Sequence, residues 1–189
     1  VVWYAYERAK SIKKARISSE KFWAKEAEAN STRKKSMADL TLITIPLDRL
    51  PITSTDDEKL GEYQDFITFL SEKDIINLTG ISNTDLKLEY GVANLPLLTH
   101  YDQCYTHLVR TLQAFAQLLY DNGYEAECVP VLEFAVETGS DISTTYKLLA
   151  QLYVKNGEKE KLMLLKSKTE SLNSAMKKPI DRMLQEFDL

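Results

Sequence analysis

The sequence has little of what turn-rich or membrane-spanning proteins need. Its 189 residues include six glycines and five prolines, which disfavours a β-sandwich or barrel because those folds depend on many tight turns. It contains no run of about 20 apolar residues, which a helix needs to cross a bilayer. Two cysteines are too few for a disulfide framework in a chain of this length. These absences favour a chain built of helices.

Motifs for catalysis and for metal or nucleotide binding are also missing. The chain has no glycine-rich phosphate-binding loop, no His-Glu-x-x-His, no Cys-x-x-Cys and no nucleophile elbow. The nearest approach to a metal site is the row His100, Cys104 and His107 on one helical face. A closed zinc site needs four ligands, so this row is better explained by packing or surface exposure. We therefore expect no enzymatic activity, no metal and no cofactor.

Charge is distributed unevenly along the chain. Residues 1–36 hold ten of the 24 Lys and Arg and four of the 28 Asp and Glu, so this stretch carries +6 and residues 37–189 carry −10. Nucleic-acid binding needs a basic surface, and the acidic body speaks against it. The basic arm fits attraction to anionic lipid, although a solvated helix with an uneven charge count is an equal alternative.

The first residues, Val-Val-Trp-Tyr-Ala-Tyr, are apolar and aromatic, and the basic residues Arg8, Lys10, Lys13 and Lys14 follow. Trp and Tyr favour the membrane interface, and Lys and Arg cluster on the cytoplasmic side of a spanning helix. Together with the missing initial Met, this order predicts a fragment whose transmembrane helix, before Val1, has been removed. The basic residues would then lie near the lipid and the remainder would face the cytoplasm. An ordinary amphipathic helix is the alternative.

Four consecutive parts are expected. Residues 1–36 form a basic helix or stalk, because Ala, Lys, Glu and Arg dominate without Gly or Pro. Residues 37–55 form an extended linker that packs on the body. Residues 56–98 form a helical cap, and residues 99–189 form a helical repeat domain. Within the linker, the apolar residues expected to be buried are Leu40, Leu42, Ile45 and Leu47.

The cap is expected to hold two helices. Asp57 lies in a run of small polar and acidic residues typical of a helix start, and apolar residues then recur at a spacing of three or four up to about Lys73. Ser82 is expected to cap a short helix that ends at Gly91.

A repeat organises the last part. Gly123 and Gly157 each follow an Asn, and each is expected to end a helix. They lie 34 residues apart (157 − 123), and apolar residues recur in register with them: Leu112 and Tyr146, Phe115-Ala116 and Leu149-Ala150, Leu119 and Tyr153, followed by Cys128, Leu132 and Ala135. This pattern resembles the tetratricopeptide family, whose period is 34 residues. Lys166 and Thr169 depart from it, because the family prefers apolar residues and Ala at these positions.

The resemblance implies an all-α fold. Antiparallel helical hairpins would stack as a short right-handed solenoid with a capping helix, preceded by a long N-terminal helix and an extended segment. Asp141 is expected to cap the second repeat. The open end of a solenoid needs covering, and the residues that predict the capping helix share one apolar face: Met176, Ile180, Met183, Leu184 and Phe187. With the expected tether, the chain resembles the soluble part of a membrane-anchored bacterial member of the family.

In this family, the first helix of each hairpin lines a concave groove that receives peptides. Carried over by position, the groove would present polar residues: Arg110, Gln113, Gln117, Tyr120, Lys147, Gln151 and Lys155. The resemblance therefore implies a non-catalytic scaffold that binds a protein or peptide, and Lys147 and Lys155 favour an acidic one. The alternatives are an ordinary solvated surface, or a structural or self-assembling protein whose groove is filled by its own residues 40–51.

Overall fold

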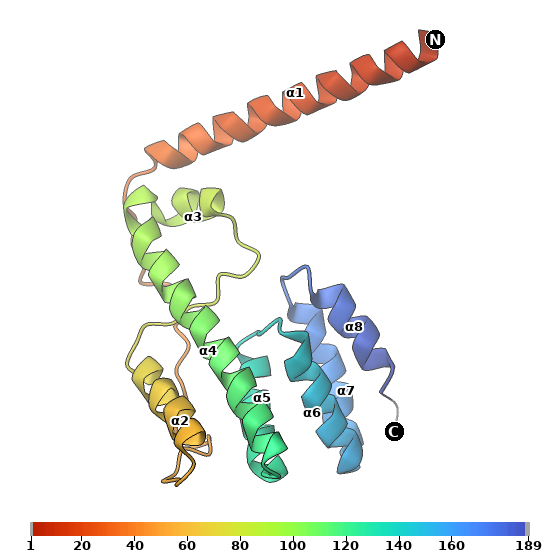
Figure 1. The fold of residues 1–189 in the computed structure, drawn as a ribbon. Helices are drawn as coiled ribbons and strands as arrows, with labels where there is room; N and C mark the ends of the chain where they lie inside the picture. The colour runs from red at the N-terminus through yellow and green to blue at the C-terminus, as the bar shows by residue number, and fades with distance from the viewer. Residues whose placement is uncertain (1, 188–189) are drawn as a thin grey trace. The chain divides into compact units, whose positions relative to one another are not determined.

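The structure, a computed structural model, describes residues 2–187, and for residues 2–9 and 11–15 it describes the backbone only. Within this range all regular structure is helical, which confirms the all-α prediction (Figure 1). The α-helices are α1 (Val2–Ser31), α2 (Glu58–Ser71), α3 (Asn83–Tyr90), α4 (Leu95–Asp121), α5 (Glu125–Glu137), α6 (Ser143–Lys155), α7 (Lys159–Lys168) and α8 (Lys177–Gln185). Two 3₁₀ turns, η1 (Val92–Asn94) and η2 (Thr169–Ser171), complete the order. In the described range, no helix combines the length and apolar character needed to cross a membrane.

The chain divides into two compact units, each made of two separate stretches. Unit 1 comprises Val1–Leu40 and Ile81–Leu98, and unit 2 comprises Thr41–Gly80 and Thr99–Leu189. This division differs from the four consecutive parts expected from the sequence. The expected cap is shared between the units, because α2 belongs to unit 2 and α3 to unit 1.

In unit 1, the last turns of α1 pack on α3. Lys25 Nζ lies 2.6 Å from Asp85 Oδ1, and Glu26 forms an ion pair with Lys87 and accepts a hydrogen bond of 2.6 Å from the Thr84 hydroxyl. Ala29 is fully buried beneath these contacts. Polar pairs therefore hold the two helices together around a small apolar contact.

The predicted helix ends are confirmed at several positions. Asp57 accepts hydrogen bonds from the amides of residues 59 and 60 at the start of α2, at 3.0 and 3.1 Å. Ser82 accepts one from the amide of residue 85 at the start of α3. Gly91 ends α3, and Gly123 and Gly157 follow α4 and α6 with positive φ angles of 83° and 70°. Local capping chemistry thus sets these boundaries.

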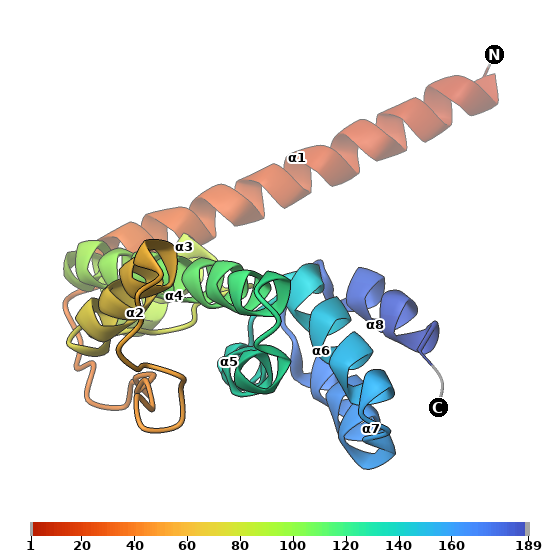
Figure 2. The ribbon, with the colours of Figure 1, turned by 60° about the horizontal axis from the view of Figure 1, so that its bottom comes forward.

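Unit 2 is built around one apolar core. The positions predicted from the repeat are buried in it: Leu112, Phe115, Ala116, Leu119, Cys128, Leu132, Ala135, Tyr146, Leu149, Ala150 and Tyr153. Helix α6 contacts α5, α7 and α8 (Figure 2). As predicted, α8 turns apolar residues to this core, since Ile180 and Leu184 are buried. Met176 is exposed, so the apolar face of α8 is shorter than expected.

The linker residues are only partly as predicted. Ile45 is buried, but Leu42 is 43% exposed, and Leu50, which was not expected in the core, is buried. Residues 47–51 form turns rather than continuing an extended run. Leu40 and Leu47 are half-buried, so the burial expected of this segment is incomplete.

One prediction in the second repeat needs correction. Asp141 does not cap α6, because Ile142 occupies the N-cap position without a side-chain hydrogen bond. The Asp141 carboxylate instead accepts a hydrogen bond of 2.5 Å from the Ser174 hydroxyl. The departures at Lys166 and Thr169 also have a structural reason. Lys166 Nζ donates to the carbonyl oxygen of Phe187 at 2.7 Å, and the buried Thr169 hydroxyl bonds to Asp181 on α8.

Candidate functional site

The residues predicted to line a groove lie on α4 and α6. Most are exposed: Arg110, Gln117, Lys147, Gln151 and Lys155. Gln113 and Tyr120 are half-buried. We call these seven residues the polar face.

Three members of the polar face already have partners within the chain. Gln113 Oε1 accepts a hydrogen bond of 2.6 Å from the Thr145 hydroxyl, which joins α4 to α6. Lys155 Nζ lies 2.5 Å from Glu125 Oε2, and this carboxylate raises the pKa of Lys155. Gln117 donates to Asp121 at 2.9 Å. Arg110 and Lys147 are therefore the best placed to meet an external acidic group.

Residues 40–51, proposed as an internal occupant of the groove, make their polar contacts elsewhere in unit 2. The amide of Ile43 donates to the carbonyl oxygen of Ile75 at 2.8 Å, and the Gln64 side chain on α2 donates to that of Pro51 at 3.1 Å. Arg49 pairs with Glu137 on α5 at 3.2 Å. These partners lie outside the polar face, so the contacts do not support a self-filled groove.

The row of possible metal ligands does not converge. His100 Nε2 lies 4.0 Å from Cys104 Sγ, whereas the His107 ring stands edge-on to Phe66, 6.2 Å between centroids. In the part of the chain that is described, no three His, Cys, Asp or Glu side chains gather as metal ligands would.

Of the basic residues expected near lipid, the side chain of Lys10 is described, and it is exposed. The side chains of Arg8, Lys13 and Lys14 fall outside the description, as does Val1. Further along α1, large apolar side chains lie in solvent: Ile17, Phe22 and Trp23. Trp23 is 65% exposed.

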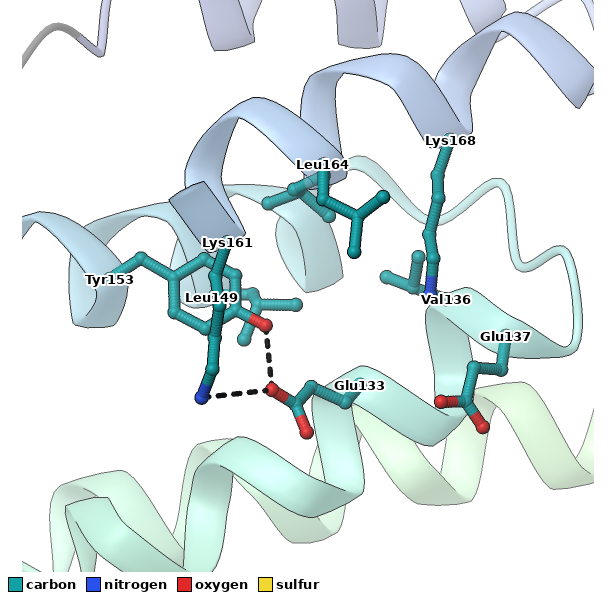
Figure 3. A pocket seen from close by; sticks show the side chains of 9 residues that line it. Glu133, Val136, Glu137, Leu149, Tyr153, Lys161, Leu164 and Lys168 are labelled. Carbon is teal, nitrogen blue, oxygen red and sulfur yellow. Dashed lines mark hydrogen bonds and ion pairs between the residues drawn. The ribbon is translucent and has the colours of Figure 1, made fainter. Parts of the chain in front are cut away.

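A cleft of about 200 Å³ lies between α5, α6 and α7 (Figure 3). Val136 contributes an apolar wall from α5, and Leu149 contributes one from α6. Leu164 and Leu165 face them from α7. Leu165 is buried, but Leu164 is 56% exposed. The cleft is therefore an apolar recess that is open to solvent.

Charged groups stand on opposite sides of this recess. Glu133 and Glu137 lie on α5, whereas Lys161 and Lys168 lie on α7. Glu133 accepts a hydrogen bond of 2.7 Å from the Tyr153 hydroxyl and lies 3.7 Å from Lys161 Nζ. Burial, together with this bond to Glu133, raises the pKa of Tyr153. This end of the cleft is thus closed by an internal polar network.

Sequence reasoning missed the cleft, although α7 carries a signal for it. Leu162, Met163, Leu164 and Leu165 are four consecutive apolar residues in one helix. Successive helical positions differ by about 100°, so four in a row point around most of the helix and cannot all face one core. Leu162 and Leu165 are buried, and Met163 and Leu164 are exposed.

Comparison with protein-family models, with curated proteins and with solved structures found no match to this chain.

Proposed function

We propose that the chain is a non-catalytic protein-interaction scaffold that binds a protein or peptide on its polar face. In this proposal α4–α5 and α6–α7 are two tetratricopeptide-like hairpins, with α8 as the capping helix. The proposal rests on one observation: α4 and α6 bury residues spaced 34 apart in a shared core while they expose a polar face. The hydrogen bond from Thr145 to Gln113 ties the two helices together beneath that face.

The non-catalytic part of the proposal is supported by the buried polar groups of unit 2. A nucleophilic cysteine needs a lowered pKa, whereas burial raises the pKa of Cys128 to about 12. The Cys128 thiol donates a hydrogen bond of 3.2 Å to the carbonyl oxygen of Ala116. These are features of a packed thiol.

The test is differential capture by three forms of the immobilised protein: wild type, the double variant Arg110→Glu, Lys147→Glu, and the control Lys178→Glu, Arg182→Glu. All four positions are exposed, and both variants change one Arg and one Lys, so their net charges match. Binding of each captured protein is then measured with purified components. We expect a partner that binds the wild type and the control and loses at least tenfold in affinity for the polar-face variant. Equal capture by all three forms would place binding elsewhere.

We also propose that α1 attaches the scaffold to an anionic lipid surface. It exposes Lys10, Arg16 and Lys21 together with Phe22 and Trp23, and aromatic and basic residues favour the interface of such a membrane. Co-sedimentation with phosphatidylcholine vesicles, with and without phosphatidylserine, tests this directly. We expect binding only to the anionic vesicles, weakened by Lys10→Glu, Lys21→Glu and by added salt. Equal sedimentation with both vesicle types would contradict an electrostatic attachment.

A further inference from the structure

The α5–α7 cleft has the size of one apolar side chain. Pockets for drug-sized ligands occupy about 300–1,000 Å³, whereas a cavity of about 150 Å³ holds a benzene molecule. The observed 200 Å³ lies close to the second value. Because the recess is open to solvent and has apolar walls, an external apolar group that filled it would gain van der Waals contacts with those walls.

The exposed wall of the cleft carries an apolar residue where a solvated helix would carry a polar one. Leu164 is 56% exposed and points into the recess (Figure 3). An apolar group inserted beside Leu164 would cover this side chain, whereas Val136 opposite it is already buried. Covering apolar surface contributes about 25 cal/mol for each Å² removed from water.

The charges around the cleft set which ligand it favours. Glu137 is paired with Arg49, and Lys161 lies 3.0 Å from Glu158 and 3.7 Å from Glu133. Lys168 is half-buried and reaches from α7 toward Val136 (Figure 3). Among the ion pairs between described residues, none involves the Lys168 ammonium group. Lys168 therefore presents a positive charge beside the apolar recess.

We propose that this cleft binds a partner segment through one leucine- or phenylalanine-sized side chain with an acidic residue beside it. The apolar side chain enters between Val136 and Leu164, and the neighbouring carboxylate pairs with Lys168. The site lies between α5 and α7 and includes none of the seven polar-face residues. This proposal can therefore be tested separately from the proposed function.

The experiment uses a random heptapeptide display library as its probe. The library is selected against the full chain and against Leu164→Glu, Lys168→Glu and Met163→Glu. Met163 is the matched control, because it is 63% exposed and neighbours Leu164 but does not line the cleft. Circular dichroism checks that each variant keeps its helix content, and sedimentation velocity checks that each stays in the same oligomeric state.

We expect wild-type and Met163→Glu selections to enrich Leu, Ile, Phe or Met next to Asp or Glu. Leu164→Glu should abolish the enrichment, since a charge would enter the apolar recess. Peptides selected on Lys168→Glu should still contain the apolar residue, but the residue next to it should be Lys or Arg in place of Asp or Glu. Synthetic peptides with Glu and with Gln beside the apolar residue should differ at least threefold in affinity for the wild type.

Several results would overturn the proposal. Enrichment that survives in Leu164→Glu would place the peptides elsewhere, and loss of the same peptides in Arg110→Glu, Lys147→Glu alone would assign them to the polar face. An acidic preference that persists in Lys168→Glu would remove the role of that ammonium. Self-association of the wild type that Leu164→Glu abolishes would make a second copy of the chain the occupant.

Discussion

At the residue scale, a glycine matters most where a side chain would have no room. Gly80 and Gly123 both belong to unit 2, and their φ angles are 80° and 83°. A Cβ atom at Gly80 would overlap the carbonyl oxygen of Asn173, whereas one at Gly123 would meet nothing within 4 Å. The two positions thus share a positive φ angle and differ in the space around the Cα atom.

Replacement by alanine should separate these two effects. Gly123→Ala should destabilise the protein by about 1 kcal/mol, because an L residue is strained at positive φ. Gly80→Ala should cost at least about 2 kcal/mol more, since a backbone oxygen must also move. Urea denaturation followed by circular dichroism measures both. Similar urea midpoints for the two variants would show that the loop around Gly80 rearranges with little loss of stability.

The thiol of Cys128 provides a second prediction at this scale. Burial raises its pKa from 9.0 to about 12, so folding favours the protonated thiol. The resulting contribution to stability is complete below about pH 9 and declines as the pH rises from 9 toward 12.

In a Cys104→Ala background, Cys128 in the native protein should react with Ellman's reagent at pH 8 at least a hundredfold more slowly than in 6 M urea. The reagent requires an accessible thiolate, and the side chain is fully buried. Rates followed from pH 7 to 9 provide the measurement. Rapid labelling of the folded protein at pH 8 would contradict this burial.

At the scale of the element, α8 is held by residues that do not fit the repeat pattern of α7. The Thr169 hydroxyl donates to the Asp181 carboxylate, and its oxygen lies 2.7 Å from the carbonyl oxygen of residue 166. Thr169→Val should therefore destabilise α8 by about 1–2 kcal/mol, because it leaves the partly buried Asp181 carboxylate without this partner. Amide hydrogen exchange across residues 177–185 should accelerate while exchange in α4 stays unchanged.

The control is Ser171→Ala. The Ser171 hydroxyl makes a similar short-range bond of 2.8 Å to the carbonyl oxygen of Lys168, but the residue is exposed. Ser171→Ala should leave the amide exchange rates of α8 unchanged. If both variants accelerate exchange equally, the reduced protection of α8 comes from disruption at the C-terminal end of α7. It would then not depend on the hydrogen bond between Thr169 and Asp181.

Helices and their ends were predictable because they depend on local chemistry. Gly157 ends α6 and Ser82 caps α3 through groups within a few residues. Asp141 was predicted as a cap by the same rule, and the prediction is wrong because a distant hydroxyl, that of Ser174, binds its carboxylate. Leu42 was predicted to be buried and is 43% exposed. At Asp141 a tertiary partner overrode the local preference.

At the scale of the whole molecule, the sequence carries little information on which stretches associate. Unit 1 joins α1 to α3 through Lys25, Glu26, Asp85 and Lys87. Such charges are common on solvated helices, and nothing in their local spacing identifies partners about 60 residues away. The cleft was missed for the same reason, because its walls come from three helices and the local signal is limited to the apolar run 162–165 on α7. The candidate site is therefore predictable as polar positions on α4 and α6, and not as a cavity.

The two units should respond differently to acid. In unit 1 the hydrogen bond from Lys87 lowers the pKa of Glu26, and the one from Lys25 lowers that of Asp85. A carboxylate with a lowered pKa stabilises the fold above its unfolded value, and this contribution is lost as the pH falls through the folded value. Unit 2 depends instead on an apolar core. Contacts between α1 and α3 should therefore loosen below about pH 4, the ordinary range of carboxyl groups, before unit 2 changes.

Amide resonances followed by NMR from pH 7 to 3 measure this order. Ala29 and Leu86 report on unit 1, and Leu112 and Leu132 report on unit 2, since all four are buried. In the variant Glu26→Gln, Asp85→Asn, the unit 1 contacts should be weaker at pH 7 and should no longer depend on pH in this range. A single transition shared by all four reporters would mean that the two units unfold as one. A unit 1 transition that persists in the variant would mean that other carboxylates control it.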